Sequence, residues 1–229
     1  MFDFIDIYCE RTAPGLFNEP VNAATNAAFF VAAWLVLRSA RASGRLDLPL
    51  KILIGLVFAI GTGSLLWHLF AQRWALITDV VPILLFIVFY VGLAMWRYFG
   101  ARPAEAVALA VAFLFFSPGL QRAAAATLPP AFGPALGYMP ALVVLLLCGG
   151  LLWLRRHPVA PWLLGSGAVF AVSLTFRALD YAVCGAFPTG THFLWHILNG
   201  VVLGLLMAAY MRHGVTAPVR QRAGAAAPA

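Results

Sequence analysis

Residues 63–82, GSLLWHLFAQRWALITDVVP, decide the fold class because they join two strongly apolar segments and carry polar groups at the junction. Ser64, His68 and Asp79 lie inside or at the rim of these segments. Ionisable side chains are costly within a membrane span, and those that occur there commonly mark functional sites. We therefore interpret this stretch as the meeting point of two membrane helices that carry part of a site.

The composition of the whole chain is typical of a polytopic membrane protein. Of its 229 residues 63% are hydrophobic and only 10% are charged, and the mean hydropathy is +0.91. A run of about 20 apolar residues is long enough to cross a bilayer. The sequence predicts an all-α integral membrane bundle of seven transmembrane helices, at residues 20–38, 50–70, 77–96, 104–116, 136–154, 161–176 and 192–211. The expected domains are an external acidic segment (1–19), the catalytic bundle (20–212) and a disordered cytoplasmic tail (213–229).

Basic residues predict the orientation of the bundle. Of the 15 lysines and arginines, the following eleven fall on one side of the predicted spans: Arg38, Arg41, Arg45, Lys51, Arg97, Arg102, Arg155, Arg156, Arg212, Arg220 and Arg222. Such an excess marks the cytoplasmic side. We expect the N-terminus outside, in the periplasm or a lumen, and the C-terminus in the cytoplasm. The net charge of +7 is thus explained by the orientation of the protein in the membrane, and we expect no nucleic-acid partner. The sequence does not predict an oligomeric state.

A second polar cluster lies far downstream, in THFLWHILN at residues 191–199. His192 and His196 are four residues apart, so both imidazoles leave one face of a helix. With His68 they supply the three protein ligands that a catalytic zinc takes while one position stays open. Two histidines at this spacing can also be structural, stacking or bonding to the backbone. Both histidines fall at the same depth as His68 and Asp79, in the outer half of the bundle. This favours a zinc site over structural histidines.

The roles of Asp79 and Ser64 follow from a zinc site at this depth. Asp79 is either a fourth ligand or the base that takes a proton from the water that the zinc activates. Ser64 lies one turn before His68 on the same helix face, where it could stabilise a developing oxyanion. A serine nucleophile is less expected, because the metal supplies hydroxide without a dedicated base.

The N-terminal segment holds half of the eight acidic residues of the chain, Asp3, Asp6, Glu10 and Glu19. This segment is either a solvated tail or a set of oxygen ligands for a hard cation such as calcium. In the predicted topology Cys9 and Cys184 both lie on the external side, where disulfides persist, whereas Cys148 lies within a span. We predict a Cys9–Cys184 disulfide; two free cysteines are the alternative.

Five segments in this order and spacing resemble the alkaline ceramidase family, within the superfamily that also contains adiponectin-receptor-like proteins: IYCER (7–11), NEPVNAATN (18–26), GSLLWH (63–68), TDVVP (78–82) and HFLWH (192–196). The resemblance covers all seven predicted spans. It implies hydrolysis of the amide of ceramide, or of a related N-acyl sphingoid base in the membrane, to a sphingoid base and a free fatty acid.

The resemblance also implies residue roles. His68, His192 and His196 would bind zinc, Asp79 would orient or deprotonate water, and Ser64 would assist at the oxyanion. Tyr8 through its backbone, Glu10 and Glu19 would bind calcium, and Cys9 and Cys184 would form a disulfide. The sequence departs from the family pattern at Ile7, Thr12 and Val80, where an acid, an asparagine and a carboxylate are expected.

Two other functions compete with the hydrolase. An adiponectin-receptor-like signalling protein with weak hydrolase activity shares the superfamily, but its relatives have the inverted orientation. A transporter or proton-coupled channel needs polar residues through both leaflets, and the inner halves of these spans have almost none. The predicted orientation and the one-sided polar cluster therefore favour the hydrolase.

Overall fold

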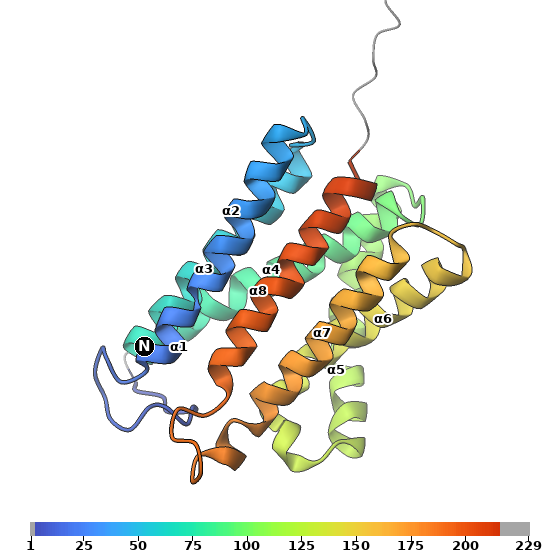
Figure 1. Ribbon diagram of the computed structural model, residues 1–229. Helices are drawn as coiled ribbons and strands as arrows, with labels where there is room; N and C mark the ends of the chain where they lie inside the picture. The colour runs from blue at the N-terminus through green and yellow to red at the C-terminus, as the bar shows by residue number, and fades with distance from the viewer. Residues whose placement is uncertain (1–2, 216–229) are drawn as a thin grey trace, which may run out of the picture.

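The computed structural model describes residues 3–215, and within them the chain is helical, apart from connecting loops and one isolated β-bridge (Figure 1). The α-helices are α1 (Pro20–Thr25), α2 (Ala27–Ala42), α3 (Leu48–Phe70), α4 (Arg73–Arg97), α5 (Pro103–Thr127), α6 (Met139–Leu154), α7 (Ala160–Leu179) and α8 (His192–His213). Two 3-10 segments, η1 (Pro130–Tyr138) and η2 (Tyr181–Val183), precede α6 and follow α7. Seven described stretches, counting α1 with α2 and η1 with α6, are long and apolar enough to cross a membrane. The predicted all-α seven-helix bundle is confirmed.

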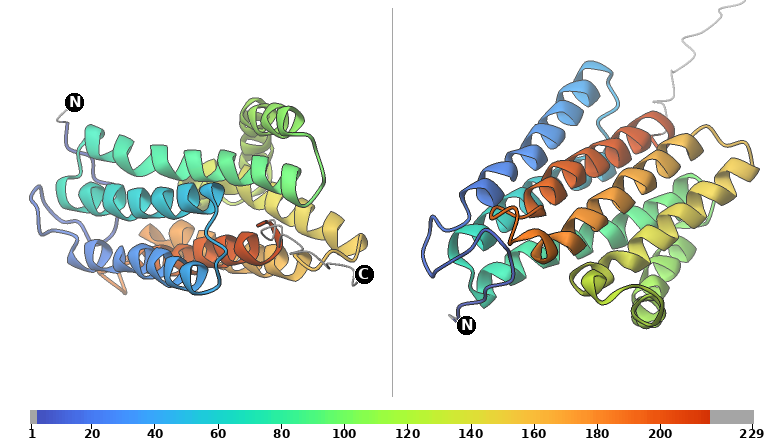
Figure 2. Two further views of the ribbon diagram at one scale, coloured as in Figure 1. Left: turned by 90° about the horizontal axis from the view of Figure 1, so that it is seen from above. Right: turned by 60° about the horizontal axis from the view of Figure 1, so that its bottom comes forward.

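Successive helices pack in a closed ring. Each helix from α2 to α8 contacts the next along the chain, and α8 returns to pack against α2 and α3. Helix α5 lies at the edge of the bundle (Figure 2). The N-terminal segment and the α7–α8 loop lie together at one end (Figure 1). We call this end, where α3 and α7 finish and α4 and α8 begin, the site end.

A tight turn joins α3 to α4 at the site end. Ala71 ends α3 in a left-handed conformation, with φ of 47°, and Gln72 is the N-cap of α4. Such a short connection makes the two helices antiparallel neighbours. His68 in the last turn of α3 and Asp79 in the second turn of α4 are therefore held at the same end of the bundle.

Gly63 lets α3 and α4 approach each other closely beside Asp79. A Cβ atom at Gly63 would lie 1.9 Å from the carbonyl oxygen of Thr78 and 3.0 Å from the backbone nitrogen of Asp79. These atoms belong to the backbone, which cannot move aside as a side chain can. The two helices therefore touch at the turn that carries the carboxylate of the site.

We expect Gly63→Ala to destabilise the bundle, because overpacking of this kind costs about 1–3 kcal/mol. The measurement is the thermal unfolding temperature of the purified protein in detergent. Gly55→Ala, in the same helix, is the matched control, because its Cβ would meet nothing within 4 Å. Equal unfolding temperatures for the two variants would contradict the close approach.

Several predicted span boundaries differ from the ends of the helices. The fourth span does not end at residue 116, since α5 continues to Thr127. The stretch between the predicted fourth and fifth spans, residues 117–135, is therefore largely helix α5 and segment η1. A run of alanines before Thr127 favours the helix, which continues past Pro118. The third span begins at Arg73 rather than residue 77. The first span begins at Pro20 as predicted and extends to Ala42, with a break at Asn26 between α1 and α2. Of the predicted tail at 213–229, residues 216–229 lie outside the described residues.

Candidate metal centre

Three histidines meet at the site end of the bundle. His68 comes from the last turn of α3, and His192 and His196 come from the first two turns of α8. Each is 1% exposed, and each offers one ring nitrogen within 4.8 Å of the others. Among the described residues this is the only such group of three or more histidine, cysteine or acidic side chains. The predicted convergence is confirmed, and the three residues could hold a metal ion.

In the imidazoles of His68 and His196, the hydrogen-bond partner of Nδ1 determines which ring nitrogen carries the proton. His68 Nδ1 lies 2.5 Å from Glu19 Oε2, and a carboxylate only accepts, so Nδ1 donates. His196 Nδ1 lies 3.0 Å from Thr25 Oγ1, which itself donates to the carbonyl of Val21 at 2.9 Å. When the single hydroxyl proton of Thr25 goes to Val21, His196 Nδ1 donates to Thr25. With both rings neutral in this tautomer, both Nε2 atoms would carry a free lone pair.

Those two lone-pair nitrogens face each other. His68 Nε2 and His196 Nε2 are 3.0 Å apart, and neither ring is exposed to water that could separate them. At this distance a proton on one Nε2 would make a hydrogen bond between the rings; with neither nitrogen protonated the two repel each other, and a cation bound by both removes the repulsion. Histidine ligands of metals commonly donate their other N–H to a carboxylate or similar acceptor. Glu19 and Thr25 supply such acceptors here.

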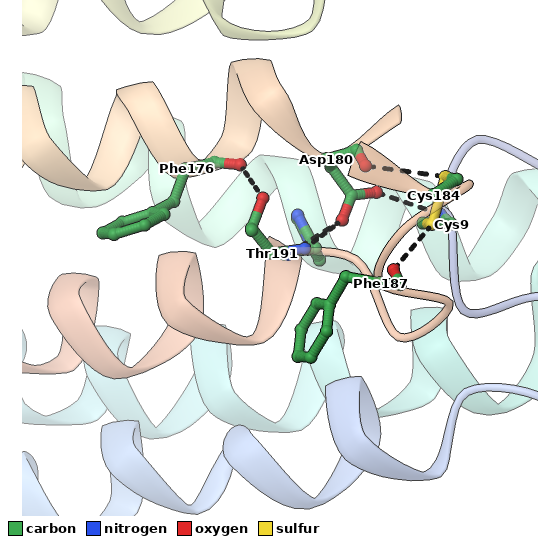
Figure 3. Close-up of a disulfide and its surroundings, with 7 residues drawn as sticks. Cys9, Phe176, Asp180, Cys184, Phe187 and Thr191 are labelled. Atoms are coloured by element: carbon green, nitrogen blue, oxygen red, sulfur yellow. Dashed lines mark hydrogen bonds between the residues drawn. A yellow bond between two sulfur atoms is a disulfide. The ribbon is translucent and has the colours of Figure 1, made fainter. Parts of the chain in front are cut away.

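His192 is held by its neighbours on three sides. Asp180 accepts hydrogen bonds from the backbone nitrogens of Thr191 (2.7 Å) and His192 (2.9 Å), which caps the start of α8; Figure 3 shows Asp180 beside Thr191. The ring of Tyr8 stacks on that of His192 at a centroid distance of 3.9 Å. Arg177 Nη1 lies 3.4 Å from His192 Nδ1. These contacts fix where α8 begins and how the ring is oriented.

Tyr8 itself is buried, and its ring rather than its backbone makes the contacts with the histidines. Its hydroxyl accepts hydrogen bonds from Trp67 Nε1 (3.2 Å) and Arg177 Nη1 (3.4 Å). Burial is the main cause that raises the pKa of the Tyr8 phenol above its ordinary value. The hydroxyl therefore stays protonated at neutral pH.

The residues predicted for calcium make separate contacts. Both oxygens of Glu10 accept backbone hydrogen bonds, from Val21 (2.7 Å) and Asn22 (2.8 Å), at the start of α1. Glu19 pairs with Arg11 and His68 instead. Burial would raise the pKa of Glu19, but the hydrogen bonds and charges of His68 and Arg11 lower it below its ordinary value. Glu19 is therefore an ionised partner of the histidine cluster.

Ser64 and Asp79 line one end of an internal cavity. Both are buried, Asp79 being 9% exposed. The rest of the cavity wall is almost entirely apolar and comes from helices α2, α3, α4, α6, α7 and α8, reaching Ala94, Cys148 and Leu206. Along α4 the distance from Asp79 to Ala94 is about 22 Å at 1.5 Å per residue. The cavity is therefore a long, largely apolar channel. Ser64 at its polar end lies one turn before His68 on α3, and the three histidines are not among the residues that line the cavity.

The sequence singled out neither Tyr138 nor Arg177 as a site residue, and both are functional candidates. Tyr138 lines the cavity and packs on Trp195 at 4.8 Å between centroids. Arg177 lies over the rings of Tyr8, Tyr138 and Trp195. Helix α7 extends to Leu179, past the predicted end of the span at residue 176, so Arg177 lies inside a span, where a cation is itself a signal of function.

The predicted disulfide between Cys9 and Cys184 is confirmed (Figure 3). It ties the N-terminal segment to the connection between α7 and α8, across 175 residues of sequence. Asp180 strengthens the same junction by accepting a hydrogen bond from the backbone nitrogen of Cys9 at 3.0 Å. The segment that carries Tyr8, Glu10 and Arg11 is thus fixed against the start of α8.

We expect Cys9→Ser to lower the thermal unfolding temperature, because removal of a disulfide typically costs about 2–5 kcal/mol. Reductant should lower the unfolding temperature of the wild-type protein and leave Cys9→Ser unchanged. Cys148→Ala removes the free cysteine and is the control that should keep the response to reductant. Insensitivity of the wild-type protein to reductant would contradict the prediction.

Comparison with known proteins adds no relative to this description. The sequence matches none of the protein-family models against which it was compared, and none of the curated proteins. The chain is an α-helical protein with seven potential membrane spans and a buried three-histidine centre that could hold a metal ion.

Proposed function

We propose that the protein is a zinc-dependent intramembrane amidase that hydrolyses ceramide, or a related N-acyl sphingoid base, to a sphingoid base and a free fatty acid. The observation that carries the proposal is the buried group of His68, His192 and His196, each offering one ring nitrogen within 4.8 Å of the others. Nε2 of His68 and Nε2 of His196 are 3.0 Å apart, and Nδ1 of each has a hydrogen-bond partner, Glu19 or Thr25. A metal ion bound by the three rings explains why these imidazoles converge in a buried place.

The donor set fits zinc. His68, His192 and His196 would hold the ion, and three neutral imidazoles with one open position are typical of catalytic zinc sites. Bound zinc supplies a Lewis acid that polarises a carbonyl and lowers the pKa of water to about 7. Glu19 and Thr25, as hydrogen-bond acceptors from His68 and His196, hold the two rings in the tautomer that binds a metal through Nε2.

Asp79 and Ser64 supply the proton transfers and the hydrogen bond that amide hydrolysis requires. The Asp79 carboxylate takes a proton from the attacking water as its oxygen bonds to the amide carbon. Ser64 donates a hydrogen bond to the carbonyl oxygen as that oxygen gains negative charge. Asp79 then returns the proton to the nitrogen as the C–N bond breaks, which releases the amine and the carboxylic acid.

The apolar channel supports a lipid substrate. Its polar end holds Ser64 and Asp79, and the remaining wall suits a long hydrocarbon chain. An amide at the polar end with its acyl chain in the channel would place the scissile bond beside the histidine cluster. The similarity of five sequence segments to the alkaline ceramidase family is the ground for naming ceramide as the amide.

The orientation proposed with this function places the site end outside and the C-terminus in the cytoplasm. The basic residues of the loops support it, and so does the Cys9–Cys184 disulfide, because disulfides persist in oxidising compartments. We expect a reporter enzyme that works only in the cytoplasm to be active when it is fused to the C-terminus. A C-terminus on the outer side would favour the adiponectin-receptor-like signalling protein instead.

The experiment that tests the activity uses the purified protein with a panel of lipids. Ceramides of several chain lengths, an N-acyl amino acid and a diacylglycerol are incubated with the protein, and released fatty acid is quantified. We expect release from ceramides, its loss with a zinc chelator and its return with added zinc. Release that a chelator does not affect, or none from any N-acyl lipid, would refute the proposal.

A further inference from the structure

The side chain of Arg11 fills a hollow lined by oxygen atoms. The residue is 3% exposed although it lies in the N-terminal segment, outside the helices. Its guanidinium pairs through Nε with Glu19 Oε1 and donates to three backbone carbonyls. These are His68 at 2.7 Å, Gly15 at 3.1 Å and Ala13 at 3.4 Å. Oxygens from three parts of the chain thus converge on one cation.

Carboxylate and carbonyl oxygens are the ligands that calcium prefers, and the family resemblance places calcium on this segment. The residues as arranged do not fit the ion. One oxygen of Glu19 is bound to Arg11 and the other to His68, and both oxygens of Glu10 accept backbone hydrogen bonds. A divalent cation here would compete with the guanidinium for Glu19 and be repelled by it.

We infer that the guanidinium group of Arg11 takes the place of a calcium ion in this protein and positions His68 for metal binding. An arginine guanidinium stays charged at every physiological pH and cannot dissociate from the chain. Arg11 reaches His68 in two ways, through the backbone carbonyl of His68 and through Glu19, which accepts from His68 Nδ1. It is a positioning residue and has no contact with the proposed substrate channel.

The N-terminal segment is fixed on both sides of Arg11, which supports a permanent role for its side chain. Cys9 is bonded to Cys184, and Glu10 holds the start of α1 through two backbone nitrogens. Arg11 therefore enters the hollow from a constrained backbone. The inference rests on the proposed metal-binding role of the histidines but not on the identity of the lipid.

The first test measures the response of the folded protein to calcium. The thermal unfolding temperature of the full-length, zinc-loaded protein is followed as calcium chloride is added, with magnesium chloride as the ionic control. We expect no calcium-specific shift in the wild-type protein. In Arg11→Ala, which leaves Glu19 and the three carbonyls without a cation, we expect a lower unfolding temperature that calcium raises. A saturable, calcium-specific rise in the wild-type protein would overturn the inference.

The second test measures the metal site itself and does not depend on lipid turnover. Arg11→Lys keeps the positive charge but cannot bond to all four oxygens, and loss of such a supporting contact typically weakens metal binding about 10–100-fold. We expect weaker zinc binding and altered visible absorption bands of the cobalt-substituted protein. Arg102→Ala, which removes an exposed arginine paired with Glu105, is the control that should change neither.

The outcomes of the second test separate the inference from the proposed function. A folded Arg11→Lys with wild-type zinc affinity and cobalt spectrum would overturn the positioning role. A wild-type protein that binds neither zinc nor cobalt would refute the proposed metal site, while the calcium titration would still test Arg11 as the resident cation. A protein that binds zinc but hydrolyses no lipid would refute the amidase activity and leave the role of Arg11 standing.

Discussion

Replacing His196 with alanine is expected to remove both the bound zinc and the release of fatty acid. His196 supplies one of three nitrogens around the proposed ion, and its Nε2 faces that of His68 at 3.0 Å. With two ligands the zinc content should fall from about one ion per chain to near zero. Hydrolysis should then fall to the background rate, because without the metal the pKa of water rises far above the value of about 7 that zinc-bound water has. Elemental analysis and the lipid assay measure the two losses.

His213→Ala is the matched control for this prediction. His213 is the last residue of the same helix, α8, and lies at the opposite end from the three-histidine centre. The control variant should keep both zinc and activity. Bound zinc at the wild-type level in His196→Ala would contradict the ligand set, and wild-type activity without zinc would contradict metal-dependent hydrolysis.

Asp79→Asn is expected to keep the zinc and lose turnover. The substitution preserves the size of the side chain but removes the carboxylate that accepts the proton, and loss of a general base typically lowers the rate about 10²–10⁴-fold. The zinc content and the unfolding temperature should stay near those of the wild-type protein. The catalytic rate at saturating lipid is the quantity to measure.

Asp3→Asn controls for the loss of a negative charge at the site end, because Asp3 is exposed and pairs only loosely, at 3.9 Å, with Arg73. It should leave turnover unchanged. Loss of zinc from Asp79→Asn would assign Asp79 as a fourth ligand, which is the alternative that the sequence left open. Turnover at the wild-type rate would exclude Asp79 as the base.

The position of the site within the bundle could be predicted because helix geometry is regular. His192 and His196 share a helix face at their spacing, and the apolar length needed to cross a bilayer sets the ends of the spans. Together these rules placed His68, Asp79 and the histidine pair at one depth. Irregular segments follow no such period, so the 3-10 segment before α6 was missed. Helix α5 is regular, and its extension to Thr127 was missed because the prediction ended the span with the apolar run of residues 104–116.

The sequence by itself determined the seven-helix membrane architecture, the three histidines and the cysteine pair, because hydrophobic length and helical period act locally along the chain. Only the tertiary structure decided which groups complete the site. Two residues of the N-terminal segment, Arg11 and Glu19, contact His68, and Thr25 of α1 contacts His196. Glu19 and His68 are 49 residues apart in sequence, and Thr25 and His196 are 171 residues apart. Such partners are chosen by how loops and helices pack, and no local pattern encodes that choice.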